Sequence, residues 1–338
     1  MQSILVTGSA GFIGANLVER LLDRQEVTRI VGLDNLNDYY EASLKEYRLR
    51  QIEVKTTERP EHEYVFVKGD LRNRDLLEAL FREYRFDIVV NLAAQAGVRH
   101  SIEEPEAYVE SNVIGFFHIL EACRHWPVKH LVYASSSSVY GGNTKVPFSV
   151  EDRVDNPVSF YAATKKSNEL FASCYSTLYG IPETGLRFFT VYGPAGRPDM
   201  AYFDFTDKLV RGEKIELYNY GNCSRDFTYI DDIVEGIERV MGRAPEGHAL
   251  FNIGAGRPVN LLDFVQTLQE ELVRAGVLPQ DYDFEAHKEL APMQPGDVPT
   301  TYADTSALER DFGFTPKIPL REGLRRFAEW YKTYYQNR

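Results

Sequence analysis

Cysteine is scarce in this sequence, with three residues among 338. Cys123, Cys174 and Cys223 lie far apart and match no spacing typical of zinc ligands, so neither a disulfide framework nor a zinc site is expected. This cysteine usage fits a protein of the reducing cytoplasm best. The seven histidines contain no close pair at metal-ligand spacing, and the acidic residues are spread along expected helices. We therefore expect no bound metal.

A long hydrophobic run is also missing. No stretch of about 18 apolar residues occurs, so no membrane span is expected. The chain runs from Met1 directly into an apolar strand, which leaves no room for a signal peptide and agrees with a cytoplasmic location. With 43% hydrophobic and 26% charged residues, the composition is that of a soluble globular protein with ample core for one large domain or two closely associated ones.

An excess of basic residues is lacking too, because the formal net charge is −12. Nucleic acids are bound through clustered lysine and arginine, so a nucleic-acid partner is not expected. The negative charge does not exclude small anionic ligands. A few local arginines and backbone amides can hold a diphosphate on an otherwise acidic protein.

Expected strands and helices alternate up to residue 190, which predicts an α/β fold with a doubly wound parallel sheet of the Rossmann type. We expect residues 1–190 to form a dinucleotide-binding domain, joined by a returning segment at about 225–260. Residues 191–338 would mainly form a smaller, interleaved α/β substrate domain without a linker. The expected strands cover residues 3–7, 29–34, 64–71, 87–93, 130–134 and 184–194. The expected helices lie from after Gly14 to about 23, within 35–62, and at 74–82, 109–124, 161–180, 231–241, 261–275 and from 320.

Three glycines at positions 8, 11 and 14 follow the first expected strand and open a helix. In such a turn the amides at the helix amino terminus receive a pyrophosphate. A structural turn without a ligand is as consistent with Gly8, Gly11 and Gly14 taken alone. The second strand, however, ends in Asp34, twenty residues past Gly14, where a carboxylate accepts the adenosine ribose hydroxyls and repels a 2′-phosphate. The combination favours NAD over NADP.

Tyr161 and Lys165 are spaced so that both side chains fall on one face of one helix. A free phenol has a pKa near ~10, and a shift of roughly 3 units, about 4 kcal/mol, would make it a base at neutral pH. A neighbouring ammonium group supplies part of that shift. The serine run from Ser135 to Ser138 closes an apolar strand, and ligands of open α/β sheets bind where strands end. Taken alone, Tyr161 and Lys165 also fit an ordinary surface helix.

Further candidates are less specific. Asp70 ends the third expected strand, where it would reach an adenine edge or simply form a turn. The small residues that follow the fourth strand, from Ala94 to Ser101, let backbone approach a cofactor closely. Asn112 lies inside a mostly apolar helix, and we place it behind the site.

Five motifs stand out together along the chain: Thr7-Gly-Ser-Ala-Gly-Phe-Ile-Gly14, Asp34-Asn35, Tyr133-Ala-Ser-Ser-Ser-Ser-Val-Tyr140-Gly, Tyr161 to Lys165, and Arg225-Asp-Phe-Thr-Tyr-Ile-Asp231. Over nearly the whole chain, they resemble the extended short-chain dehydrogenase/reductases that act on nucleotide sugars. Four further segments, residues 33–40, 93–99, 187–200 and 293–297, are within that superfamily most similar to the UDP-glucuronate 4-epimerases.

The resemblance implies an isomerase that uses tightly bound, regenerated NAD to epimerise C4 of UDP-glucuronate, giving UDP-galacturonate through a 4-keto intermediate. Tyr161 would be the base, Lys165 would lower its pKa and hold the nicotinamide ribose, and Ser136 would share the hydrogen bond to O4. A homodimer paired through the helices of Asn112 and Tyr161 is common in the superfamily. Implied cofactor-binding residues are Gly8, Gly11, Phe12, Ile13, Gly14, Asp34, Asn35, Asp70, Leu71, Leu92, Ala93, Gln95, Asn112, Tyr161, Lys165 and Phe189, and implied substrate-binding residues are Arg99, Ser136, Ser137, Ser138, Thr190, Arg197, Tyr218 and Arg225.

The chain departs from related enzymes at two places. Dehydratases and decarboxylases of the superfamily carry acidic residues directly after the active-site hydroxyl, whereas this chain has Ser137 and Ser138. Gln294 lies where hexose epimerases use an arginine at the diphosphate, and we expect Arg225 to take that place. Two alternatives stay open: a UDP-hexose or UDP-N-acetylhexosamine 4-epimerase with the same catalytic residues, and a non-catalytic dinucleotide-binding sensor. A sensor would be free to lose Tyr161 or Lys165, and both are present.

Overall fold

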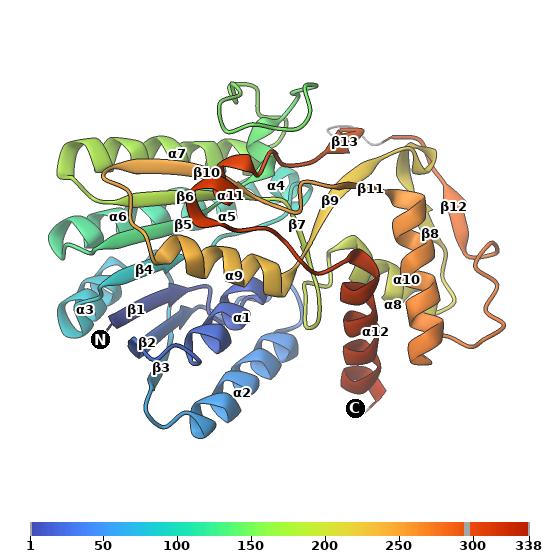
Figure 1. Cartoon of the computed structure of the whole chain (residues 1–338), viewed down its shortest axis with the longest axis horizontal. Helices are drawn as coiled ribbons and strands as arrows, with labels where there is room; N and C mark the ends of the chain where they lie inside the picture. The colour runs from blue at the N-terminus through green and yellow to red at the C-terminus, as the bar shows by residue number, and fades with distance from the viewer. Residues whose placement is uncertain (1, 294–297, 337–338) are drawn as a thin grey trace.

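The computed structural model describes residues 2–293 and 298–336. Within these residues, seven parallel strands form the main sheet, which confirms the predicted Rossmann-type fold (Figure 1). No described helix combines the length and the apolar character that crossing a bilayer requires. In spatial order the strands are β10 (His248–Ile253), β6 (Glu183–Phe188), β5 (His130–Ser136), β4 (Ile88–Asn91), β1 (Gln2–Thr7), β2 (Val27–Asp34) and β3 (Glu63–Lys68).

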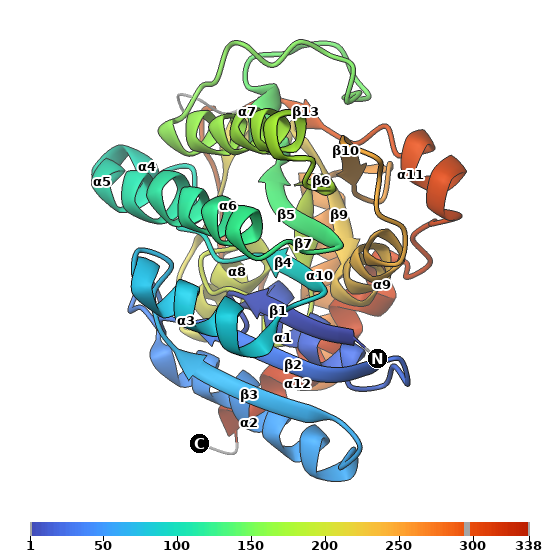
Figure 2. The ribbon, with the colours of Figure 1, turned by 90° about the vertical axis from the view of Figure 1, so that its left-hand side faces the viewer.

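Helices cover both faces of this sheet, as parallel strands buried on two sides require. Each face has its own set of buried apolar side chains, and Figure 2 shows the two helical layers on either side of the strands. One layer holds α1 (Phe12–Leu21), α2 (Ala42–Glu58) and α9 (Ile230–Met241), and the other holds α3 (Arg74–Tyr84), α6 (Gly115–His125) and α7 (Phe160–Tyr179).

Helix α6 is preceded by a turn of π-helix and two short α-helices. The segment predicted as one helix from residue 109 begins as a single π-helical stretch, η1 (Val109–Ile114), and continues without a break as α6. Two short helices precede it, α4 (His100–Glu103) and α5 (Pro105–Tyr108). π-Helical turns inside α-helices are frequent near functional sites, and this one carries Asn112.

The predicted sixth strand is in fact two. β6 ends at Phe188, and after Phe189 the chain leaves the main sheet as β7 (Thr190–Tyr192), which pairs in parallel with β9 (Ser224–Tyr229). The strand expected to continue therefore changes sheets at its end. The strand pattern of residues 184–194 does not reveal such a change, because either sheet can bury its apolar side chains.

The carboxyl-terminal part stands beside the main sheet, at the right of Figure 1. In the described residues it contains a four-stranded sheet, in which β11 and β13 flank β9 and β7 also pairs with β9, and the two-stranded pair of β8 and β12. Helices α8, α10 and α12 lie alongside. The bounds are β8 (Ile215–Leu217), β11 (Pro258–Asn260), β12 (Lys288–Leu290), β13 (Thr300–Thr301), η2 (Ser137–Tyr140), η3 (Tyr218–Gly221), α8 (Ala201–Val210), α10 (Leu261–Ala275), α11 (Ser306–Phe312) and α12 (Leu320–Gln336).

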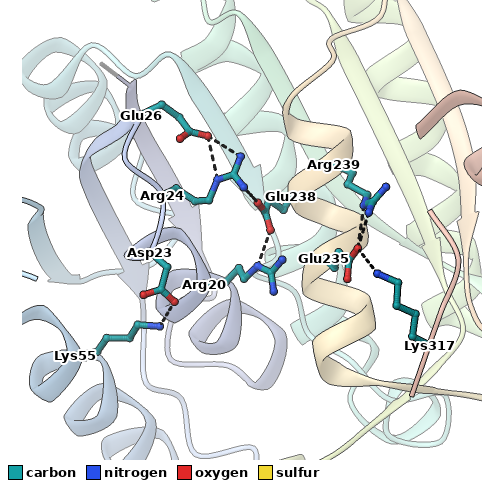
Figure 3. Close-up of polar contacts among 9 residues, drawn as sticks. All are labelled: Arg20, Asp23, Arg24, Glu26, Lys55, Glu235, Glu238, Arg239 and Lys317. Atoms are coloured by element: carbon teal, nitrogen blue, oxygen red, sulfur yellow. Dashed lines mark hydrogen bonds and ion pairs between the residues drawn. The ribbon is translucent and has the colours of Figure 1, made fainter. Parts of the chain in front are cut away.

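Ion pairs join the returning helix α9 to the amino-terminal helix region. Glu238 of α9 accepts from Arg20 at 2.6 Å and also pairs with Arg24 (Figure 3). Asp23 in turn holds Lys55 of α2 at 2.6 Å. The Glu238 side chain is only 10% exposed, so its two arginine partners offset the cost of taking its charge out of water.

Candidate active site

One cavity of about 1080 Å³ lies along the carboxyl ends of the main-sheet strands and reaches into the carboxyl-terminal part. Both the expected cofactor residues and the expected substrate residues line it, although they are far apart in the sequence. Of the predicted site residues, these line the cavity: Gly8, Gly11, Phe12, Ile13, Gly14, Asp34, Asn35, Asp70, Leu71, Leu92, Ala93, Gln95, Arg99, Ser136, Ser137, Ser138, Tyr161, Lys165, Phe189, Thr190, Arg197, Tyr218 and Arg225.

Asn112 is the exception, because it does not line the cavity. Its amide accepts a hydrogen bond from the Gln95 nitrogen at 2.8 Å and donates to the Gln95 carbonyl at 3.0 Å and to Thr164 at 3.1 Å. Asn112 thus fixes the backbone of a lining residue from behind and ties it to helix α7. This position agrees with a supporting role and not with a direct contact to a cofactor.

The glycine-rich turn forms a cradle that side chains would fill. Gly8 has φ +69°, which an L-residue rarely adopts, and a Cβ on Gly14 would stand 2.1 Å from the Gly8 carbonyl oxygen. Helix α1 begins at Phe12 with no side-chain cap and no acidic residue in its first turn. Among the described residues, the amides of Phe12 and Ile13 have no hydrogen-bond acceptor, and both residues line the cavity. Open amides at a helix amino terminus suit a pyrophosphate.

Asp34 lies at the end of β2, on the cavity wall next to this turn. Its carboxylate accepts from the Ala10 amide at 3.0 Å and from the Leu36 amide at 2.8 Å. The same carboxylate therefore orients the glycine-rich turn and faces the space where a ribose would lie. Next to it, Asn35 donates to Asp70 at 2.9 Å, which brings the ends of β2 and β3 together.

Tyr161 and Lys165 lie on the first turns of α7, whose start is capped by Ser159 accepting from Ala162 at 3.1 Å. The Lys165 ammonium donates to the Ala134 carbonyl at 2.9 Å and lies 6.0 Å from the centre of the Tyr161 ring. Ser136 ends β5, and its hydroxyl accepts from the Ser138 amide at 3.1 Å. The predicted trio thus meets in one place, with the serine hydroxyls and the phenol facing the same space.

The sequence suggested that Lys165 lowers the pKa of Tyr161, but in the structure other groups act on this pKa. Burial raises the pKa of Tyr161, and the hydrogen bond with Ser136 and the positive charge of Arg197 oppose this rise. Burial also lowers the pKa of Lys165 to about 8. Lys165 directs its ammonium group at the Ala134 carbonyl and is not among the groups that lower the pKa of Tyr161. Positive groups in the site, Arg197 among them, have to supply the remaining shift, because a positive charge favours the phenolate.

A buried ion pair supports the trio from below. Arg187 of β6 and Glu169 of α7 form a bidentate pair at 2.8 and 2.9 Å, with both side chains 1% exposed. Glu169 also accepts from Ser135 at 2.7 Å, the residue directly before Ser136. Because Glu169 lies one turn after Lys165, the pair fixes the serine run relative to the Tyr161 helix. Neither residue was predicted, since a glutamate on a helix and an arginine in a strand carry no sequence signal of pairing.

The three arginines predicted to bind the substrate differ in whether a carboxylate already pairs with them. Arg197 is held by Asp199, with Nε to Oδ1 at 3.0 Å and Nη2 to Oδ2 at 2.5 Å. Arg225 of β9 donates through Nη1 to the carbonyls of Ser224 and Pro299, and Arg99 lies over the Tyr218 ring at 5.2 Å. Within the described residues neither Arg225 nor Arg99 forms an ion pair with a carboxylate, so both keep charge available for an anionic ligand.

Gln294, the second departure noted in the sequence, lies outside the described residues. The described chain contains no group of three or more His, Cys, Asp or Glu side chains that could hold a metal ion. The cavity also exposes charged and aromatic residues that the sequence did not single out, among them Tyr39, Lys45 and Asp199.

Comparison with known proteins places this architecture in a family. Residues 5–327 match the family described as GDP-mannose 4,6 dehydratase. This chain belongs to that family. As a member of it, the protein is an extended short-chain dehydrogenase/reductase, as its motifs indicated.

Individual proteins are similar to the chain over 98–99% of its length. Protein CapI from Staphylococcus aureus is 46% identical over 352 residues, covering 99% of this chain and 100% of CapI. UDP-glucuronate 4-epimerase 4 from Arabidopsis thaliana is 44% identical over 350 residues, covering 98% of this chain and 76% of the plant protein. The crystal structure of a UDP-glucuronic acid 4-epimerase from Bacillus cereus, in complex with UDP-glucuronic acid and NAD, matches with a TM-score of 0.86 at 31% identity, covering 98% of this chain and 100% of that one.

Proposed function

We propose that this family member is an isomerase, a UDP-sugar 4-epimerase that uses NAD and acts on UDP-glucuronate to give UDP-galacturonate. One observation carries the proposal. Tyr161, Ser136 and Lys165 share a single cavity with an open glycine-rich turn, and the positions after Ser136 hold neutral serines. Two of the named relatives, the Arabidopsis thaliana and Bacillus cereus proteins, are UDP-glucuronate 4-epimerases by name and support the same activity.

The chain's own residues fit NAD. The unpaired amides of Phe12 and Ile13 would hold the pyrophosphate, and Asp34 would accept the ribose hydroxyls and exclude a 2′-phosphate. Bound NAD supplies an acceptor and donor of hydride next to the sugar. In this proposal residues 1–190, with the returning segment at about 225–260, bind NAD, and residues 191–338 mainly bind the nucleotide sugar.

Tyr161 would remove the proton from the sugar 4-hydroxyl while the C4 hydride leaves, and would return the proton when hydride comes back to the opposite face of the ring. Ser136 would hold O4 through its hydroxyl. Lys165 would orient the ribose and keep a positive charge near the phenol. Since the pKa of Tyr161 is raised by burial, the positive groups in the site, Arg197 included, would supply the stabilisation of the phenolate.

The serines after Ser136 favour epimerisation over the reactions of dehydratases and decarboxylases. Those reactions need an extra general acid or base, worth ~10²- to 10⁴-fold each. Ser137 and Ser138 supply neither. With Thr190, they offer neutral hydroxyl donors on the cavity wall that would hold the sugar carboxylate in an orientation unfavourable for loss of CO₂.

The test is NMR of UDP-glucuronate incubated with the purified protein and no added NAD. Appearance of UDP-galacturonate signals is expected, and their loss in Tyr161→Phe would assign the base. If the protein converts UDP-glucose or UDP-N-acetylglucosamine faster than UDP-glucuronate at equal concentration, the alternative hexose or hexosamine epimerase is correct. Binding of NAD without turnover of any of these sugars would instead support the sensor.

We further propose that the protein is a cytoplasmic homodimer. Apolar side chains remain exposed on the adjacent helices η1, α6 and α7, among them Phe117 at 44% and Leu170 at 58%. The Phe117 ring lies against the Tyr175 ring of α7, so the apolar side chains of α6 and α7 adjoin at this point. A second copy of the same surface would cover it.

A further inference from the structure

Helix α2 carries a buried guanidinium group that the proposed chemistry does not use. Arg48 is 2% exposed and donates from all three of its nitrogens. An arginine stays charged at any working pH, yet among the described residues no carboxylate forms an ion pair with Arg48. Its acceptors are the carbonyl oxygens of Ala195 at 2.9 Å, Ala10 at 3.0 Å and Gly196 at 3.0 Å, and the Tyr40 hydroxyl at 2.7 Å.

These acceptors belong to both sides of the cavity. Ala10 lies within the glycine-rich turn of residues 8–14, the expected pyrophosphate site. Ala195 and Gly196 lie in the loop of residues 193–199, which leads from β7 to α8 and carries Arg197. One planar side chain therefore joins the cofactor turn to a loop of the substrate side, across 147 residues of sequence from Arg48 to Ala195.

The 193–199 loop has a conformation that needs such support. Ala195 has φ +51°, in the left-handed region that non-glycine residues rarely adopt. A Cβ on Gly196 would stand 1.6 Å from the Tyr202 hydroxyl, so the chain passes close to α8. Arg48 donates to the carbonyls of both residues, and through these two bonds it holds the loop in the shape that presents Arg197 to the cavity.

A second contact from the same region holds the far end of this loop. The Tyr39 hydroxyl donates to Asp199 at 3.1 Å, and Asp199 in turn pairs with Arg197. Tyr39 and Arg48 both come from the segment between β2 and β3. Its contacts now connect the two binding regions.

We propose that Arg48 is a positioning residue that fixes the 193–199 loop against the glycine-rich turn and thereby sets the affinity for the nucleotide sugar. The part that concerns affinity rests on the proposed function. Because Arg48 does not line the cavity, it acts through the loop and through Arg197, and not by touching the ligand. The positive charge of Arg48 directly behind the turn also favours a diphosphate there.

The test compares Arg48→Met and Arg48→Lys with Arg50→Met. Arg50 lies on the same helix, is exposed, and has only a 3.9 Å contact with Glu46, so its variant controls for the loss of one helix arginine. Lysine keeps the charge but lacks the planar fork, and so it cannot reach the loop and turn carbonyls together. Each variant is measured by hydrogen exchange of the 193–199 amides, and by KM and kcat for UDP-glucuronate.

In both Arg48 variants we expect the amides of residues 193–199 to exchange faster. We also expect KM to rise about tenfold or more, while kcat changes less than about threefold. The reason is that a displaced binding loop weakens substrate contacts before it disturbs the reacting groups. Arg50→Met should match the unmodified protein. If Arg48→Met is too unstable to purify, Arg48→Lys carries the same comparison. Unchanged exchange together with an unchanged KM in the Arg48 variants would overturn the proposal, as would equal losses in kcat and stability without a rise in KM.

The exchange measurement needs no turnover, which separates the two proposals. If the unmodified protein fails to convert UDP-glucuronate, the proposed function fails. Faster exchange of 193–199 in the Arg48 variants would still support the role of Arg48 in fixing the loop, and normal exchange would refute it.

Discussion

We expect the buried carboxyl group of Glu183 to make the free energy of unfolding depend on pH. Glu183 is the first residue of β6, at the amino end of an interior strand and away from the carboxyl ends that line the cavity, and it is fully buried. In the described part of the chain neither of its carboxyl oxygens has a hydrogen-bond partner. Burial alone raises its pKa from 4.5 to about 9. At neutral pH the folded protein therefore holds Glu183 as the neutral acid, whereas the unfolded chain ionises it.

The sign of the effect follows from proton binding. Between pH 4.5 and about 9 the folded state holds one proton more than the unfolded state, so the free energy of unfolding falls by ~1.4 kcal/mol per pH unit from this residue. At pH 7 the accumulated loss is about 3 kcal/mol. This contribution is fully present below pH 4.5 and is lost as pH rises through the folded-state pKa.

Glu183→Gln removes the ionisable group and keeps its size. The variant should unfold at higher urea concentration than the unmodified protein at pH 7, with a gain of up to ~3 kcal/mol that grows between pH 5 and pH 8. Glu183→Leu, which also removes the unpaired polar atoms, should be stabilised further. The exposed Glu246 provides the control, since Glu246→Gln should leave the free energy of unfolding within about 0.5 kcal/mol. A difference between Glu183→Gln and the unmodified protein that stays constant with pH would refute this reasoning.

Three further outcomes are expected. Ser138→Glu should increase the share of decarboxylated pentose product, measured by chromatography of the nucleotide sugars, whereas the uncharged Ser138→Gln should not; an equal product ratio in both would remove the role given to the serines. Glu169→Gln should lower the free energy of unfolding by ~3 to 5 kcal/mol in urea, because it leaves the buried charge of Arg187 without its partner, and a loss no larger than that of Glu246→Gln would contradict the support assigned to the pair. The double variant Phe117→Glu/Leu170→Glu should be a monomer by light scattering, and dimers of unchanged stability would place the interface elsewhere.

The strands, the helices and their order could be predicted from the sequence, because the patterns that indicate them involve only neighbouring residues. Apolar runs with the period of strands and helices, and the glycine-rich turn before α1, follow from the geometry of neighbouring residues. The change of sheet at Phe189 and the π-helical stretch around Asn112 were not accessible, since both depend on which distant strand or helix offers a partner.

The gathering of the predicted residues follows from chain topology. Parallel strands end at one edge of the sheet, so residues placed after successive strands, such as Asp34, Gln95 and Ser136, come to line one cavity. The orientation of individual side chains does not follow from that rule. Lys165 donates to Ala134 and leaves the phenol's pKa high, and Arg197 is already bound to Asp199.

The sequence by itself determined the family, the order of the elements and the chemical types present at the site, because these depend on residue identity and spacing along the chain. Only the tertiary structure decided what lies beneath that site: the ion pair of Glu169 with Arg187, the unpaired carboxyl group of Glu183, and the bonds of Arg48 to two distant loops. The reason is physical. The energetic effect of a buried ionisable group depends on the groups that replace water around it. Those groups come from segments that only the folded chain brings into contact.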